Sequence, residues 1–392
     1  MRFELNPLLQ AVEAPPIAEV DAWLRGHAFP PDKPLLDVAQ AVPNEPPPIE
    51  LRDHLAAQLR ESGLSRYTAI LGLPRLREAL AERFSLDYEG SILPEQTAIT
   101  AGCNQAFCLA MMALAQAGDE VILPLPYYFN HQMLLEMQGV RPVHLPFVEA
   151  RGGLPDLEDA ARRITARTRA IVLITPNNPT GAEMPAEEVA AFYDLARSRG
   201  VALVLDETYR DFRRDTGPPH GLFHRPDWPE SLIHLYSFSK AYNMPGYRVG
   251  SIVASARLLQ QISKVVDCWM ISPPTLGQEA ALYALDRLGA WLGQNRQKIL
   301  GRGAALRKAF EEGGSAYRLV NVGAYFAYVQ HPFPRQSAEE VARRLAAEQN
   351  MLCLPGPVFG PGQDRFLRFA FANLEAGAMA ELVRRLAADA PA

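Results

Sequence analysis

The chain has 392 residues, 48% of them hydrophobic, and a formal net charge of −5. This length and composition support at least one large core, and at ordinary domain sizes they suggest two domains. A weakly acidic chain without a basic run interleaved with aromatic residues gives no support to binding of nucleic acid or acidic membranes. No apolar run approaches the length of a bilayer span, and the opening segment MRFELNPLLQ lacks the apolar core of a signal peptide, so we expect a cytoplasmic location.

The cysteines of the chain are Cys103, Cys108, Cys268 and Cys353. They have mostly apolar neighbours, no CxxC spacing and no adjacent histidine cluster. This pattern argues against both a disulfide framework and a structural zinc, and we expect no metal site.

The first part of the chain is rich in proline. We interpret residues 1–48 as an arm with one short helical pattern and an extended piece at 35–39. Two helical patterns follow, at about 50–61 and 74–84, and the loop between them carries Tyr67.

The middle of the chain alternates between short β-rich apolar runs and helix-like stretches. The runs lie at 98–100, 120–123, 170–175, 201–206, 232–236 and 249–253. Two of them, RAIVLIT and VALVLD, are continuously apolar, as is typical of strands that are covered on both faces. We therefore predict an α/β fold with a mostly parallel sheet, helices on both faces and binding groups at the carboxyl ends of the strands.

The last part of the chain predicts a smaller α+β unit. Residues 256–310 are helical in pattern, and we expect one long helix to lead out of the sheet domain. Beyond it, strands are predicted at 317–329, 351–354 and 365–370, and helices near 337–349 and 375–388. We place the domain boundary near residue 290, with a large domain at 49–290, a small domain at 291–392, and the arm packed with the small domain.

The polar turn SFSKAYNMPGYRVG lies between the last two strand-like runs. Lys240 can form a Schiff base with a carbonyl cofactor. The hydroxyls of Ser237 and Ser239, together with Arg248, offer hydrogen-bond donors and a positive charge to a phosphate monoester. These groups suggest pyridoxal phosphate, and the alternative is an ordinary solvated loop.

A candidate anion site follows the strand-like run at 98–100. Gly102 lets the backbone approach a ligand, and the N–H groups of Cys103 and Asn104 would lie at the N-terminus of a helix, which binds anions. The alternative is an ordinary strand-to-helix turn.

Other polar groups also follow predicted strand ends. Asp206 closes VALVLD and could hold a pyridine nitrogen protonated, although a helix cap or a structural ion pair would also use it. The loop TPNNPTG presents Asn178 as a donor, and the aromatic run at 126–130 could supply a ring that stacks on a flat cofactor, with turn and core roles as alternatives. Arg368 lies among apolar residues and needs an anion, either a substrate carboxylate or an internal Asp or Glu.

Taken together, these motifs resemble the fold type I aminotransferases of class I and II, the aspartate aminotransferase superfamily, over nearly the whole chain. The resemblance implies that Lys240 is the Schiff-base residue for pyridoxal 5′-phosphate. It implies that Asp206 contacts the nitrogen of the cofactor ring and that Asn178 and Tyr209 contact its phenolic oxygen. The other cofactor-binding residues that it implies are Gly102, Cys103, Asn104, Tyr128, Ser237, Ser239, Arg248 and Tyr67.

The same resemblance implies where the substrate and a second subunit lie. Arg368 matches the arginine that binds the α-carboxylate, near Asn178 and Tyr128. Tyr67, which precedes GLPRLREAL, matches a tyrosine that reaches the phosphate of the partner subunit, and this implies a homodimer with shared active sites. Ala41 in LLDVAQAVP stands where relatives have glycine, so the pocket is expected to differ in shape there.

The expected reaction moves the amino group of an L-amino acid to a 2-oxo acid in a ping-pong cycle of pyridoxal and pyridoxamine phosphate. Lys240, Asp206 and Tyr209 are the expected catalytic residues. Relatives that act on dicarboxylates are expected to carry a second cation, but Asn104 stands where some of them have lysine and 267–276 contains no arginine. A neutral or aromatic donor is therefore favoured, with Tyr127, Phe129, Tyr325 and Phe326 as candidate pocket residues.

Three other functions compete with this prediction. A carbon–sulfur β-lyase of the same family would use the same site for elimination. A transcription regulator with this fold would place a DNA-binding domain first, and the arm is too short and not basic enough for one. A nucleotide-binding α/β protein is disfavoured because GxxxxGK[ST], and GxGxxG after a strand, are both absent.

Overall fold

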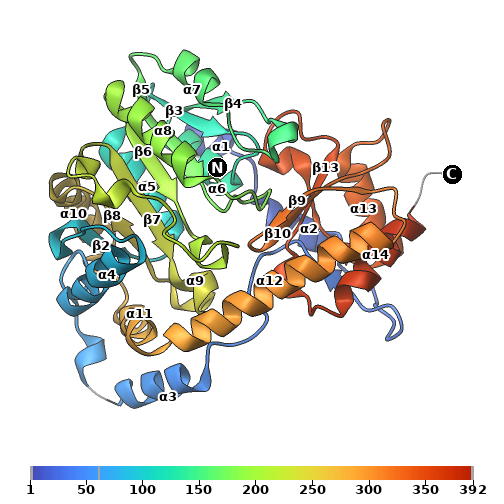
Figure 1. Cartoon of the computed structure of the whole chain (residues 1–392), viewed down its shortest axis with the longest axis horizontal. Helices are drawn as coiled ribbons and strands as arrows, with labels where there is room; N and C mark the ends of the chain where they lie inside the picture. Colours follow the sequence, from blue (N-terminus) through green and yellow to red (C-terminus); the bar gives the residue numbers. More distant parts are fainter. Residues whose placement is uncertain (1–2, 61, 390–392) are drawn as a thin grey trace.

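The computed structural model describes residues 3–60 and 62–389, and its largest element is a central sheet (Figure 1). Within these residues the sheet has seven strands in the order β2-β8-β7-β6-β5-β3-β4, and β8 alone runs antiparallel to its neighbours. The strands are β2 (Thr97–Thr100), β3 (Glu120–Pro124), β4 (Arg141–Leu145), β5 (Thr168–Ile174), β6 (Ala202–Asp206), β7 (Leu232–Ser237) and β8 (Gly250–Val253). The predicted α/β fold with a mostly parallel sheet is confirmed.

Strand β5 shows why its sequence is continuously apolar. Successive side chains of a strand point to opposite faces. Ile171 and Leu173 join one hydrophobic core, while Ala170 and Val172 join the core on the other face. Both faces of the strand are therefore buried, as the run RAIVLIT predicts.

Helices cover both faces of the sheet. The first core is closed by α3 (Ile49–Gln58), α4 (Pro74–Asp87), α7 (Leu157–Arg163), α8 (Ala186–Ser198) and α11 (Thr275–Arg287). The second core is closed by α5 (Cys103–Leu114), α6 (Phe129–Met137) and α10 (Ala256–Met270). Short α9 (Phe238–Ala241) follows β7 and carries Lys240.

A long helix, α12 (Gly289–Glu312), leads from the sheet to a smaller unit (Figure 1). There β12, β13, β10 and β9 form an antiparallel sheet in that order. The elements of the unit are the strands β9 (Arg318–Gly323), β10 (Phe326–Gln330), β11 (Met351–Leu352), β12 (Leu354–Pro355) and β13 (Phe366–Phe369) and the helices α13 (Ala338–Gln349) and α14 (Ala378–Ala388). This is the expected α+β architecture.

The N-terminal arm packs mainly onto the smaller unit, but its first helix lies against α6 of the sheet domain. It contains α1 (Pro7–Ala11), α2 (Pro16–Ala22) and β1 (Leu36–Asp37), and β1 pairs in parallel with β11. Leu36 and Val38 are buried in the core of the small unit. Together with the start of α12 at Gly289, this packing supports the division that we propose, into an arm at 1–48 and domains at 49–290 and 291–392.

The structure adds two features to the predicted elements. Residues 317–329 form a hairpin, because the chain turns between β9 and β10 where Ala324 has a φ of 46°. Strand β4 was not predicted, since its sequence RPVHL is half exposed at the edge of the sheet and lacks a continuous apolar run. No helix in the described part of the chain combines the length and apolarity that crossing a membrane requires.

Candidate active site

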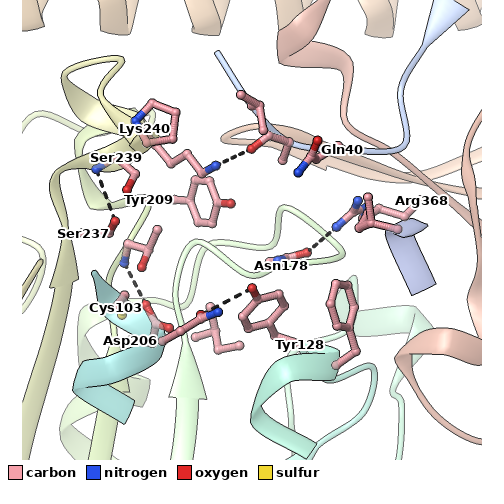
Figure 2. Close-up of a pocket in the computed structure, with 18 of the residues that line it drawn as sticks. Gln40, Cys103, Tyr128, Asn178, Asp206, Tyr209, Ser237, Ser239, Lys240 and Arg368 are labelled. Atoms are coloured by element: carbon pink, nitrogen blue, oxygen red, sulfur yellow. Dashed lines mark hydrogen bonds between the residues drawn. The ribbon is translucent and has the colours of Figure 1, made fainter. Parts of the chain in front are cut away.

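A cavity of about 210 Å³ lies at the carboxyl ends of β5, β6 and β7, beneath part of the arm (Figure 2). This is where ligands bind in open α/β sheets. The predicted site residues that line it are Ala41, Cys103, Asn104, Tyr128, Asn178, Asp206, Tyr209, Ser237, Ser239, Lys240, Arg248 and Arg368. Side chains that are more than 300 positions apart in the sequence, such as Ala41 and Arg368, thus line the same cavity.

Lys240 projects into the cavity from the short helix α9. Ser237 begins this helix, and its hydroxyl accepts a hydrogen bond from the N–H of Ser239 at 3.2 Å. The Nζ of Lys240 donates to the backbone oxygen of Ala41. Burial, with smaller contributions from Arg368 and Arg248, lowers the pKa of Lys240 to about 8. A neutral amine, which is the form that attacks a carbonyl, is therefore accessible at moderate pH.

One end of the cavity is suited to an anion. Helix α5 begins at Cys103, and the first N–H groups of a helix have no partner within it. Gly102 caps this helix with a φ of 87°, and a Cβ built there would lie 2.8 Å from Cζ of Arg248. The guanidinium therefore occupies the space that a side chain would fill. Together with the hydroxyl of Ser237, this set of donors fits a phosphate group.

Asp206 lies at the terminus of β6 and is 5% exposed. Its Oδ1 accepts a hydrogen bond from the N–H of Thr208 at 3.0 Å, and its Oδ2 lies 3.4 Å from Nε2 of His131. Burial opposes ionisation, but the hydrogen bonds from His131 and Thr208 hold the pKa of Asp206 below its ordinary value. The site thus keeps an ionised carboxylate in the protein interior, which can hold a proton on a heterocyclic nitrogen.

His131 was missed by the sequence analysis. It lies on α6, is 1% exposed, and stacks on Phe107 with ring centroids 3.9 Å apart. A lone histidine inside an apolar helix gives no sequence signal for a carboxylate partner about 75 residues away. Other cavity residues that were missed are Ile17, Gln40, Val42, Ile174, Thr208 and Pro245.

Arg368 is buried without an acidic partner. Its Nη1 donates to Oδ1 of Asn178 at 3.1 Å, and its Nη2 donates to the backbone oxygen of Ala39. Its guanidinium lies 5.1 Å from the ring centroids of both Phe326 and Phe359. Within residues 3–60 and 62–389 no Asp or Glu forms an ion pair with it, and its Nε has no partner. Burial lowers the pKa of Arg368 to about 10, so a charged and incompletely paired donor group faces the cavity.

Two tyrosines, Tyr128 and Tyr209, also line the cavity. Tyr128 donates a hydrogen bond to Oδ1 of Asn104 at 3.4 Å, and burial raises its pKa to about 12. Tyr209 packs its ring on Phe326, with centroids 5.0 Å apart, and burial raises its pKa well above the usual value. Both phenols therefore stay protonated and act as hydrogen-bond donors at neutral pH.

Three of the candidate pocket residues were wrong. Tyr127 packs away from the cavity, against Gly360. Tyr325 lies behind Lys240 and donates its hydroxyl to that residue's backbone oxygen at 3.3 Å, while Phe326 lies beneath Arg368. Each belongs to the packed support of the site, and of the four candidates Phe129 lines the cavity.

Two other predicted residues lie outside the cavity wall. Gly102 acts through its contact with Arg248, as described above. Tyr67 is 73% exposed on the loop before α4 and does not line the cavity of its own chain. Its role toward a second subunit remains a prediction.

Comparison with known proteins extends these observations to most of the chain. The family model for aminotransferase class I and II matches residues 31–386. The chain belongs to the class I and II aminotransferases. This aminotransferase is therefore a pyridoxal-phosphate-dependent transaminase, and the donors for a phosphate, the lysine amine and the buried carboxylate fit that cofactor.

Relatives and solved structures agree with this family. The aminotransferase is 28% identical to an aromatic aminotransferase of Arabidopsis thaliana over 90% of this chain and 88% of the relative. It is 31% identical to a probable aspartate/prephenate aminotransferase of Thermus aquaticus over 76% of this chain and 77% of the relative. The solved aspartate aminotransferase of Thermus thermophilus with maleate superposes with a TM-score of 0.88 at 27% identity, over 98% of this chain and 99% of that one.

Proposed function

We propose that this aminotransferase transfers the amino group of a neutral or aromatic L-amino acid to a 2-oxo acid in a ping-pong cycle. The observation that carries the proposal is the distribution of charge in the cavity. Among the described residues that line it, Lys240, Arg248 and Arg368 are the positively charged side chains. The roles proposed below use all three, so the second carboxylate of a dicarboxylic donor would face no free cation of this chain.

Apolar side chains favour the same class of donor. Ile17, Val42 and Phe129 line the part of the cavity that the arm and α6 enclose. Apolar surface of this kind contributes roughly 25 cal/mol for each Å² of substrate that it covers. The relatives are named for aromatic as well as aspartate or prephenate substrates, so their names alone do not select a donor.

Binding residues divide between the cofactor and the substrate. We assign the phosphate to Arg248, Ser237, Ser239 and the N-terminus of α5 at Gly102, Cys103 and Asn104. Asn178 and Tyr209 hold the phenolic oxygen, Tyr128 covers the ring, and Asp206 holds a proton on the ring nitrogen. Arg368 binds the α-carboxylate of the substrate, beside Asn178, Tyr128 and Ala41.

Pyridoxal phosphate, when bound, supplies the electron sink that stabilises negative charge at the substrate Cα. Lys240 would hold the cofactor through Nζ, and the free amine of the same residue would move the proton at the substrate Cα. Its low pKa suits this role, because a general base works best when its pKa is near the working pH. Such proton transfer contributes typically about 10²–10⁴ in rate.

A homodimer with shared active sites is part of the proposal. Tyr67 lies near other exposed apolar side chains, among them Ile70, Trp269 and Ile271. Thr68 N–H donates to the hydroxyl of Ser272 at 3.1 Å, so the loop of Tyr67 and the turn after α10 form one surface. An exposed apolar surface of this kind is typical of a subunit interface. The cytoplasmic location stays a prediction.

The test is the absorbance of the bound cofactor during titration with a panel of amino acids. We expect phenylalanine, tyrosine, methionine or leucine to change the cofactor band and a 2-oxo acid to restore it. Aspartate and glutamate are expected to give kcat/KM values lower by at least about tenfold, since a buried carboxylate would lack a partner. Lys240→Ala is the control that should show no turnover.

Two results would contradict the proposal. A preference for aspartate or glutamate would show that the donor class is wrong. Release of pyruvate and ammonia from a cysteine conjugate without a 2-oxo acid would assign the site to β-elimination instead.

A further inference from the structure

One segment of the arm closes a side of the catalytic cavity. We call residues 39–44 the strap, and the strap residues that line the cavity are Gln40, Ala41 and Val42. The carbonyl groups of Ala41 and Ala39 in the strap accept hydrogen bonds from Nζ of Lys240 and Nη2 of Arg368, respectively. The strap thus touches both basic groups that handle the substrate in the proposed function.

The strap follows β1 and belongs to no strand or helix. Its backbone groups therefore depend on side chains or local turns for their hydrogen bonds. The N–H of Val42 bonds to the carbonyl of Gln40 at 3.0 Å, which is a tight local turn. Such a segment needs an anchor if it is to keep one conformation.

Asn373 supplies that anchor from outside the cavity. Its Oδ1 accepts a hydrogen bond from the N–H of Val42 at 3.2 Å, and its Nδ2 donates to the backbone oxygen of Gln40. Its own backbone oxygen accepts from the side-chain amide of Asn44. One residue therefore holds the strap at three positions, and it is itself only 7% exposed.

The base on which Asn373 sits is tightly packed. Asn373 ends the 3₁₀ turn Phe371–Asn373, which follows β13, the strand that carries Arg368. Arg302 of α12 donates to the backbone oxygen of Ala372 at 2.8 Å, and Phe371 is 1% exposed in the core of the small unit. A group held on a packed element can fix a neighbouring segment with little motion.

We propose that Asn373 is a positioning residue for substrate binding. Its amide fixes the strap so that Gln40 and Val42 shape the substrate end of the cavity beside Arg368. Asn373 touches neither the cofactor nor the substrate and acts through the strap alone. The inference rests on the proposed function, because it assigns that end of the cavity to the amino donor.

The test compares the holoenzyme with its Asn373→Ala variant. We expect KM for the amino donor to rise about tenfold, because two hydrogen bonds to the strap are lost, each with a modest net contribution. The value of kcat should stay within about twofold, since Lys240 and Asp206 are unchanged. Hydrogen exchange of the peptide that contains residues 39–44 should become faster.

A matched control separates this effect from a general loss of stability. Asn350 is also buried and also tethers the arm, with Nδ2 donating to the backbone oxygen of Lys33 at 2.7 Å. It has a φ of 49°, so Asn350→Gly removes its side chain without backbone strain. This variant should keep the wild-type KM and the wild-type exchange rate of the strap.

Several outcomes would overturn the inference. One is a folded Asn373→Ala enzyme with wild-type KM, and another is an equal rise of KM in Asn350→Gly. If Asn373→Ala does not fold, Asn373→Asp keeps the acceptor for Val42 but not the donor for Gln40, and a wild-type KM in that variant overturns the inference as well. If the unmodified holoenzyme turns over no amino donor, the proposed function fails, while hydrogen exchange still shows whether Asn373 fixes the strap.

Discussion

At the scale of single residues, Lys240 acquires its chemistry from burial. A solvated lysine is protonated at neutral pH and is a poor nucleophile. In this chain burial is the largest cause that lowers the pKa of Lys240 to about 8, and the nearby Arg368 and Arg248 lower it further. The same amine in the unfolded chain would have its ordinary value near 10.5.

We therefore predict how the reactivity of the Lys240 amine changes with pH in the enzyme stripped of cofactor. A lowered pKa means that the neutral amine is present from about pH 8 upward, so labelling by an amine-specific reagent should rise with a midpoint near that pH. Mass spectrometry of the peptide that contains Lys240 measures this rate. Arg368→Gln should move the midpoint upward, because it removes a neighbouring positive charge.

A midpoint near that of the denatured chain would contradict the prediction. So would labelling of Lys240 that is insensitive to pH throughout this range. Lys264, exposed on α10, offers Lys264→Ala as a control that leaves the curve of Lys240 unchanged.

At the scale of elements, the phosphate site that we propose lies at the start of α5. Gly102→Ala would place a Cβ against the guanidinium of Arg248, at a φ of 87° that side chains rarely adopt. We expect the dissociation constant for pyridoxal phosphate to rise at least about tenfold, since Arg248 must move away. A fluorescence titration of the stripped enzyme with the cofactor measures the change.

Gly118 provides a closely matched control for this variant. It has a φ of 89°, and a Cβ there meets no atom within 4 Å. Gly118→Ala therefore carries the same backbone strain without the contact. Equal loss of cofactor affinity in both variants would show that strain, and not the displacement of Arg248, is responsible.

At the scale of the whole molecule, Tyr67 is a predicted site residue that does not line the cavity of its own chain. It is 73% exposed and lies outside the cavity, on a surface that we assign to a second subunit. In a dimer with shared sites, each site would combine Lys240 of one subunit with Tyr67 of the other. In a hybrid dimer with one substitution in each subunit, both defects would then fall in the same site, and the other site would be native.

We predict complementation between Tyr67→Ala and Lys240→Ala chains. After the two variants are mixed and allowed to exchange subunits, a hybrid dimer contains one site with both native side chains. Activity at limiting cofactor should exceed the mean of the two separate variants by up to several-fold. No gain after proven subunit exchange would show that Tyr67 does not serve the site of the partner.

Much of the architecture was readable from the sequence because it depends on short-range pattern. Continuous apolar runs identified strands buried on both faces, and polar residues directly after them identified the edge where a ligand binds. The motif around Lys240 and Asp206 meet in one cavity, since the carboxyl ends of parallel strands converge. Arg368 lines the same cavity from β13 of the small unit, which that rule does not predict. Local turn geometry hid the hairpin at 317–329, and the edge position of β4 hid its half-exposed strand.

The tertiary structure alone decided which residues support the site. His131 beside Asp206 and Asn373 beneath the strap carry no local signal, because each acts on a partner that is distant in the sequence. Tyr325 and Phe326 were aromatic candidates for the pocket, but they pack behind Lys240 and Arg368 and support those residues from outside the cavity. Sequence pattern predicted the fold, the family and the candidate reacting groups through local periodicity and motif. The lowered pKa of Lys240 and the lack of an acidic partner for Arg368 arise only when distant segments pack together and exclude water, and the anchoring of the strap depends on hydrogen bonds between such segments.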